Sequence, residues 1–150
     1  MELITKSPEE TKALGREIAN KITSNFQPPA SGAVVVALSG DLGSGKTTFT
    51  QGFAEGLEIE KRILSPTFII MRVYELETKR FYHVDLYRLE DKIDKEMENL
   101  GLFDIFKGSE NIVLIEWAEK AKEYLPADAI WITFENIDDV SRKIKINNFN

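Results

Sequence analysis

The sequence contains no cysteine and only one histidine, and these two shortages exclude several classes of function. Without cysteine the chain forms no disulfide, no thiolate nucleophile and no cysteine-ligated zinc site. A single histidine excludes histidine triads and most histidine-ligated metal sites. Long apolar runs are missing too: the longest, Ala33–Leu38, is far shorter than the ~20 residues that cross a bilayer.

Basic residues are fewer than acidic residues. Asp and Glu number 25 against 19 Lys and Arg, which gives a net charge of −6. This balance argues against a dedicated nucleic-acid binder, whose affinity comes mainly from cations set against phosphates. The first residues lack the basic start and apolar stretch of a signal peptide, so we expect a cytoplasmic protein with no membrane contact. A length of 150 residues with 43% hydrophobic residues predicts a single domain.

The pattern along the chain predicts an α/β domain with a mixed parallel and antiparallel sheet. The unbroken apolar run Ala33–Leu38 is typical of a strand buried on both faces of a parallel sheet. Asn111–Glu116 shows a second pattern of this kind, with four apolar residues before its terminal carboxylate. A capping box at Ser7 and Glu10 opens a helix whose apolar stripe is Leu14, Ile18 and Ile22. The remaining expected elements are helices at Lys46–Gly56 and Asp91–Leu100, a hairpin of Phe68–Leu76 and Arg80–Leu86, and final strands at Ala129–Phe134 and Arg142–Ile146.

The segment Gly40–Thr47 reads Gly-Asp-Leu-Gly-Ser-Gly-Lys-Thr and matches every fixed position of the P-loop pattern G-x-x-x-x-G-K-[ST]. Its glycines let backbone N–H groups turn toward phosphates, and the following helix points its positive end at the same anion. Lys46 can reach the β- and γ-phosphates of ATP, and the Thr47 hydroxyl can ligate Mg²⁺. An apolar strand before the loop and a helix after it favour nucleotide binding over a glycine-rich turn. The candidate nucleotide-binding residues here are Asp41, Leu42, Gly43, Ser44, Gly45, Lys46, Thr47 and Thr48.

Two carboxylates are candidates for holding the metal or orienting a water molecule. Glu116 follows four apolar residues, which places it at the carboxyl end of an expected parallel strand. Asp85 is the other candidate, at the end of the segment Arg80–Asp85 in the hairpin. From the residues alone, Glu116 could instead cap the next helix, and Asp85 could belong to a turn or a salt bridge.

Three other parts of the sequence allow either a functional or a purely structural interpretation. Ser65–Phe68 is held extended by its proline, and it is either a switch segment that senses the γ-phosphate or an ordinary entry into a strand. His83 alternates with Asp85 on one strand face, and we expect a structural role with a hydrogen bond to a neighbour such as Asp85. Trp117 is expected to pack rather than to stack on a base.

Four segments, in this order and at this spacing, resemble the TsaE (YjeE) family of bacterial P-loop ATPases. They are Gly40–Phe49, Ser65–Phe68, His83–Leu89 and Ile115–Trp117. The resemblance covers nearly the whole chain. It implies a P-loop NTPase-like, three-layer α/β fold with helices flanking a mixed sheet. It also implies an ATPase required for the threonylcarbamoyl modification (t6A) of adenosine 37 in ANN-decoding tRNAs.

The resemblance also implies roles for individual residues. Lys46 and Thr47 match the phosphate and Mg²⁺ residues of the family, and Glu116 matches its acidic metal-site residue. Asp85 matches the aspartate of the H-x-D-x-Y-R run and is a second candidate for the metal and for catalysis. ATP and Mg²⁺ are therefore the expected cofactors.

Two residues far from the P-loop, Thr11 and Arg142, fall where the family contacts nucleotide.

The family works with two partner proteins, TsaD, which transfers the threonylcarbamoyl group, and TsaB. The resemblance thus implies that this chain acts on tRNA only indirectly and neither makes nor transfers the group.

Other P-loop functions remain open from the residues alone. A small-molecule kinase also uses a P-loop, although the arginines beyond it are scattered rather than clustered into a lid. A nucleotide-sensing module would bind ATP without turnover. A GTPase is disfavoured because the sequence has no N-K-x-D guanine motif.

Overall fold

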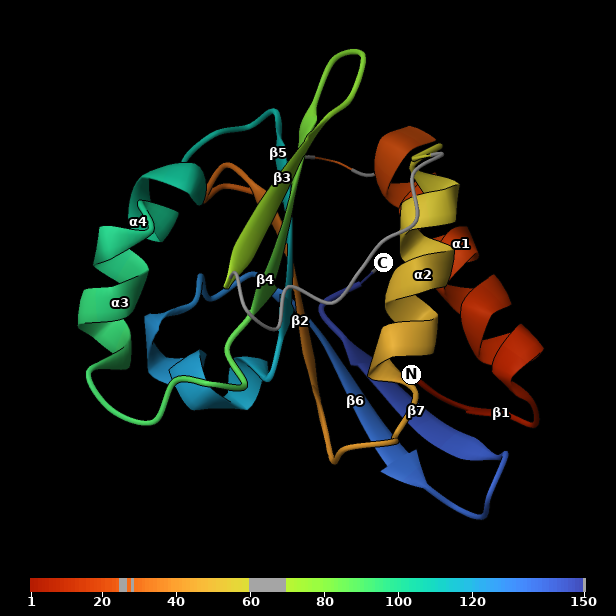
Figure 1. Ribbon diagram of the computed structural model, residues 1–150. Helices are drawn as coiled ribbons and strands as arrows, with labels where there is room; N and C mark the ends of the chain where they lie inside the picture. Colours follow the sequence, from red (N-terminus) through yellow and green to blue (C-terminus); the bar gives the residue numbers. More distant parts are fainter. Residues whose placement is uncertain (25–26, 28, 60–69, 150) are drawn as a thin grey trace. The chain divides into compact units, whose positions relative to one another are not determined.

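The computed structural model of the chain describes residues 1–24, 27, 29–59 and 70–149 (Figure 1). These residues form two compact units. The first comprises the described residues within Met1–Gln27, Ser39–Ser65 and Trp131–Asn150, and the second those within Pro28–Leu38 and Pro66–Ile130.

The first unit contains three antiparallel strands and two helices. Strand β7 pairs with β1 on one side and with β6 on the other. The rings of Phe49 and Phe134 pack edge to face in this unit's core, with centroids 5.5 Å apart. Its elements are β1 (Glu2–Thr5), α1 (Pro8–Ser24), α2 (Lys46–Gly56), β6 (Ile130–Asn136), whose first residue belongs to the second unit, and β7 (Arg142–Asn147).

Helices α1 and α2 pack backbone against backbone. A Cβ atom built on Gly52 would lie 1.9 Å from the carbonyl oxygen of Lys12, and one built on Gly15 would lie 2.2 Å from that of Phe49. No side chain fits at these distances, so both positions require glycine for the close approach of the two helices. The helix that follows the P-loop is therefore held directly against α1.

The second unit contains a mixed sheet with strand order β2, β5, β4, β3. Strands β2, β5 and β4 pair in parallel, and β3 pairs with β4 antiparallel. All of Asn111–Glu116 is buried, as is all of Ala33–Leu38. The elements are β2 (Val34–Gly40), whose last two residues belong to the first unit, β3 (Met71–Glu75), β4 (Arg80–Asp85), α3 (Ile93–Asn99), α4 (Leu102–Ile105), β5 (Asn111–Glu116) and a 3₁₀ helix (Ala118–Tyr124).

The predicted α/β class with a mixed sheet and flanking helices is confirmed. The capping box is present: Glu10 N–H donates to the Ser7 hydroxyl, and Lys6 N–H donates to the Glu10 carboxylate. The expected stripe of α1 is only partly right, because Leu14 is half-buried while Gly15 is buried. Strand β1, helix α4 and the 3₁₀ helix were not expected from the sequence.

Candidate functional site

The P-loop adopts a backbone that only glycine takes without strain. Gly43 and Gly45 have φ angles of 74° and 101°, in the left-handed region. Gly43 lies within a turn in which the Ser44 N–H donates to the carbonyl oxygen of Asp41. Helix α2 starts at Lys46 immediately afterwards, as the sequence pattern predicts.

The amino terminus of α2 is not capped by any side chain and has no acidic residue in its first turn. Helix α1 differs, because Ser7 caps it and Glu9 and Glu10 lie in its first turn. The first N–H groups of a helix need partners, and together with the helix dipole they favour an anion. The first turn of α2 is thus suited to bind an anion in place of a cap.

Two buried polar atoms near this loop have no hydrogen-bond partner among the described residues. They are the hydroxyl oxygen of Ser44 and Nε of Arg142. Buried donors without partners are unusual in proteins, and an oxygen-rich anion would satisfy them. The side chain of Lys46 is also buried, and its Nζ donates to the carbonyl oxygen of Gly40. The residues present therefore fit a phosphate group.

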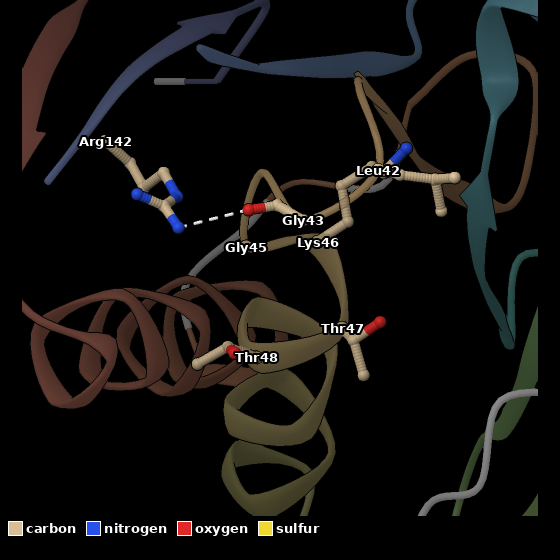
Figure 2. Close-up of a pocket in the computed structure, with 7 residues that line it drawn as sticks. All are labelled: Leu42, Gly43, Gly45, Lys46, Thr47, Thr48 and Arg142. Carbon is tan, nitrogen blue, oxygen red and sulfur yellow. Dashed lines mark hydrogen bonds between the residues drawn. The ribbon is translucent and has the colours of Figure 1, made fainter. Parts of the chain in front are cut away.

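Arg142, at the start of β7, reaches the P-loop from a distant part of the sequence (Figure 2). Its guanidinium donates to the carbonyl oxygen of Gly43 across 3.1 Å. It also donates to the carbonyl oxygens of Asp138, Asp139 and Ser141, in the turn between β6 and β7. This turn therefore fixes the guanidinium against the loop.

The carboxylate of Asp138 orders that turn. It accepts backbone N–H groups from Val140 at 3.0 Å and from Ser141 at 2.8 Å. These hydrogen bonds, led by the one from Val140, hold the pKa of Asp138 below its ordinary value.

An open pocket of about 200 Å³ lies at the P-loop. That volume is below the ~300–1,000 Å³ typical of small-molecule pockets, so it suits a phosphate tail rather than a whole nucleotide. Its lining residues are Leu42, Gly43, Gly45, Lys46, Thr47, Thr48 and Arg142 (Figure 2). Seven of the predicted nucleotide-binding residues are thus brought together here.

Three further predicted residues lie on the same loop or beside it. Asp41 is exposed and Ser44 is buried. The methyl group of Thr11 is 3.5 Å from the position a Cβ on Gly45 would occupy, so Thr11 flanks the loop. The Thr11 hydroxyl pairs with that of Thr5 at 2.7 Å and contacts the Ser7 carbonyl oxygen at 3.3 Å.

The two predicted carboxylates, Asp85 and Glu116, lie together in the second unit. They are direct register partners at the carboxyl ends of the parallel strands β4 and β5. Glu116 is also the register partner of Leu38 in β2, two residues before the P-loop begins at Gly40. Asp85 is half-buried, and its carboxylate accepts the backbone N–H of Tyr87 at 3.0 Å.

His83 does not bond the expected Asp85. Its Nε2 lies 2.6 Å from a carboxylate oxygen of Glu116, and both side chains are buried. The alternation of residues along β4 does place His83 and Asp85 on one face. The partner could not be read from the sequence, because it depends on the register of β4 against β5.

Trp117 packs, as expected. Its ring lies 5.1 Å from that of Tyr87, and the ammonium group of Lys120 lies 5.9 Å from its centroid. Lys120 also donates to the carbonyl oxygens of Tyr87 and Leu89. The segments that follow Asp85 and Glu116 are therefore held together. The predicted switch segment Ser65–Phe68 lies outside the described residues.

No group of three or more acidic or histidine side chains suited to a metal occurs in the part of the chain that is described. P-loop proteins bind Mg²⁺ with fewer side chains, one hydroxyl and one or two carboxylates together with the substrate phosphates. Thr47, Glu116 and Asp85 supply groups of these kinds. Among the described helices, none has the length and apolar character needed to cross a membrane.

Comparison with known proteins identifies many relatives. A family model described as "Threonylcarbamoyl adenosine biosynthesis protein TsaE" matches residues 5–144. The chain is 44% identical over 140 residues to the "tRNA threonylcarbamoyladenosine biosynthesis protein TsaE" of Bacillus subtilis, covering 93% of this chain and 80% of that protein. The protein of the same name from Aquifex aeolicus is 35% identical over 147 residues, which cover 97% of this chain and 94% of that protein.

A solved structure has the same fold. The crystal structure of YdiB from Bacillus subtilis superposes with a TM-score of 0.72 and 33% sequence identity. The superposition covers 97% of this chain and 83% of the YdiB chain. With a P-loop at the start of α2, a family match over residues 5–144 and relatives matched along most of their length, this chain belongs to the TsaE family.

Proposed function

We propose that this chain is the Mg²⁺-dependent ATP-binding and hydrolysing subunit required for the t6A modification of ANN-decoding tRNAs. It acts through the partner proteins TsaB and TsaD, in the cytoplasm, and contacts tRNA only indirectly. The observation that carries the proposal is the P-loop itself, with an uncapped helix terminus and buried donors without partners, in a chain whose relatives are named for t6A biosynthesis.

The residues of the P-loop hold the phosphates of ATP in this proposal. Backbone N–H groups of the loop and of the first turn of α2 donate to the phosphate oxygens, and Lys46 supplies the cation. Arg142 keeps the loop in shape through its bond to the carbonyl oxygen of Gly43. The hydroxyl of Ser44 becomes a donor to the same anion.

Thr47, Glu116 and Asp85 are the proposed ligands of Mg²⁺. When bound, the metal ion offsets the negative charge of the phosphates. Glu116 is also the proposed group that orients the attacking water molecule. The register of β5 against β2 and β4 supports this choice, since it sets Glu116 beside Asp85 on one side and beside Leu38 on the other.

The partners supply what a single P-loop domain lacks. P-loop ATPases often take a final charge from another chain, so we expect slow hydrolysis by the isolated protein and faster hydrolysis with TsaB and TsaD. The test is steady-state phosphate release, titrated with the partner pair, alongside tRNA modification in a reconstituted mixture with and without this chain. A rate that stays flat and modification that proceeds without the chain would overturn the proposal.

Glu116→Ala tests the assignment of the acidic residue. ATP should still bind through the P-loop, while hydrolysis in the activated mixture falls by at least ~10²-fold, the lower range for one general-base or positioning group. Hydrolysis at the parent rate would transfer the role to Asp85. Turnover of ATP only with an added phosphate acceptor would favour the small-molecule kinase instead.

A further inference from the structure

His83 and Glu116 form a buried side-chain pair that the proposed function does not yet use. The imidazole Nε2 lies 2.6 Å from one carboxylate oxygen of Glu116. The two side chains are 1% and 5% exposed. Of the residues that the structure describes, His83 is the only one whose side chain bonds this carboxylate.

The neighbouring strands leave His83 little freedom to move. It belongs to β4, two residues before Asp85, and β4 pairs with β5 on one side and β3 on the other. The ring of Phe81 lies parallel to the imidazole, at 8° and with centroids 6.3 Å apart. The donor that meets Glu116 is therefore fixed by sheet and ring packing rather than by a flexible side chain.

The surroundings of the second ring nitrogen bear on the tautomer of the imidazole. Nδ1 of His83 is buried and has no partner among the described residues. If Nδ1 carried a proton, a buried N–H would be left without an acceptor, which is rarer in proteins than an acceptor without a donor. The geometry thus favours the tautomer with its hydrogen on Nε2, which donates to the Glu116 carboxylate.

We propose that His83 is a positioning residue for Glu116. The imidazole holds one carboxylate oxygen of Glu116 through Nε2–H, so the other oxygen stays available. This inference rests on the proposed role of Glu116 as the acidic residue of an ATPase site. A residue that hydrogen-bonds a metal ligand or a catalytic group fixes the orientation of that group. A shift of about 1 Å in a catalytic group can lower the rate ~10²-fold.

The first test needs neither ATP nor partners. Because the chain has a single histidine, the ring nitrogen resonances of labelled protein belong to His83 without ambiguity. We expect a protonated Nε2, an unprotonated Nδ1 and a slowly exchanging Nε2 proton at neutral pH. Glu116→Ala should shift the Nε2 resonance, whereas Tyr82→Phe, on the same strand but the opposite face, should not. A proton on Nδ1 instead of Nε2 would overturn the proposal.

The second test separates positioning from simple stabilisation. His83→Phe keeps a flat buried ring but removes the donor, and His83→Gln keeps an N–H donor at a similar distance from the backbone. We expect His83→Phe to lower kcat by roughly 10- to 10²-fold with ATP affinity unchanged, and His83→Gln to recover most of kcat. Melting temperatures of both variants show whether either has failed to fold.

A double variant completes the design. In a Glu116→Gln background the added change His83→Phe should cost no further activity, because the group to be positioned is already altered. Equal losses in both backgrounds would show that His83 only stabilises the sheet. If the parent shows no hydrolysis even with its partners, the proposed function fails, while the nitrogen resonances still decide the contact with Glu116.

Discussion

The guanidinium of Arg142 and the carbonyl oxygen of Gly43 are joined by a hydrogen bond of 3.1 Å between residues 99 positions apart in the sequence. The bond ties the start of β7 to the P-loop. The loop conformation therefore depends on the turn between β6 and β7 as well as on its own glycines.

Arg142→Ala should weaken ATP binding about tenfold. Hydrogen bonds to charged groups contribute ~1.5–3 kcal/mol, and ~1.4 kcal/mol corresponds to a factor of ten in affinity. Arg142→Lys should recover only part of the loss, because an ammonium group cannot span several carbonyl oxygens as the planar guanidinium does. Nucleotide titration measures both variants, with Lys145→Ala on the same strand as the charge control. If Arg142→Ala binds ATP as tightly as the parent protein does, Arg142 does not have this role.

Lys46→Ala should weaken ATP binding at least ~10-fold, since it removes a charged donor from the phosphate site. The melting temperature should change little, because the Nζ group meets the backbone of the loop rather than the apolar core. Nucleotide titration and thermal melting test the two statements separately. Lys21→Ala, on the surface of α1, serves as the control for loss of one lysine. If affinity is unchanged, the phosphate assignment of the loop is wrong.

The lowered pKa of Asp138 predicts that the stability of the folded protein depends on pH. Its pKa is lowered by the backbone N–H groups of Val140 and Ser141, so its contribution to stability is present above the ordinary carboxyl pKa of about 3.9. That contribution is lost as the pH falls through the lower pKa of the folded protein. The melting temperature of the parent should exceed that of Asp138→Ala near neutral pH, and the difference should shrink in acid. Asp139→Ala, the neighbouring residue, is the matched control, and a difference that stays constant with pH would refute the prediction.

Gly52→Ala should destabilise the protein although alanine favours helices by ~1 kcal/mol over glycine. The added methyl group would lie 1.9 Å from the carbonyl oxygen of Lys12, and overpacking of a core typically costs ~1–3 kcal/mol. Because the obstructing atom is backbone, we expect the upper part of that range and a melting temperature lower by several degrees. Gln51→Ala, the preceding residue of α2, should leave the melting temperature near that of the parent. A stabilised Gly52→Ala would show that the two helices separate easily.

Local patterns made the P-loop and the two buried strands predictable. Gly43 and Gly45 are needed by the loop backbone itself, and the four apolar residues within Asn111–Glu116 are needed by a strand covered on both faces. Strand β1 escaped prediction because a strand of four residues, Glu2–Thr5, is too short for its alternation to stand out. Its pairing with β7 is what makes it a strand.

Contacts between distant segments were the part that the sequence could not supply. The bond from His83 to Glu116 depends on the register of β4 against β5, and alternation along one strand gives only the face. Arg142 was placed near the nucleotide by family resemblance, and its contact with Gly43 depends on how the hairpin of β6 and β7 folds. The closeness of α1 and α2 depends on Gly15 and Gly52, which an apolar stripe does not include.

The glycine contacts between α1 and α2 also restrict how the protein can change shape. Helices that slide past each other do so by small shear movements of packed side chains. At Gly15 and Gly52 the touching atoms are main-chain atoms, and no rotamer exists there that could switch. We therefore expect the two helices to move together, and we expect a rearrangement on ATP binding in segments other than the junction of these helices.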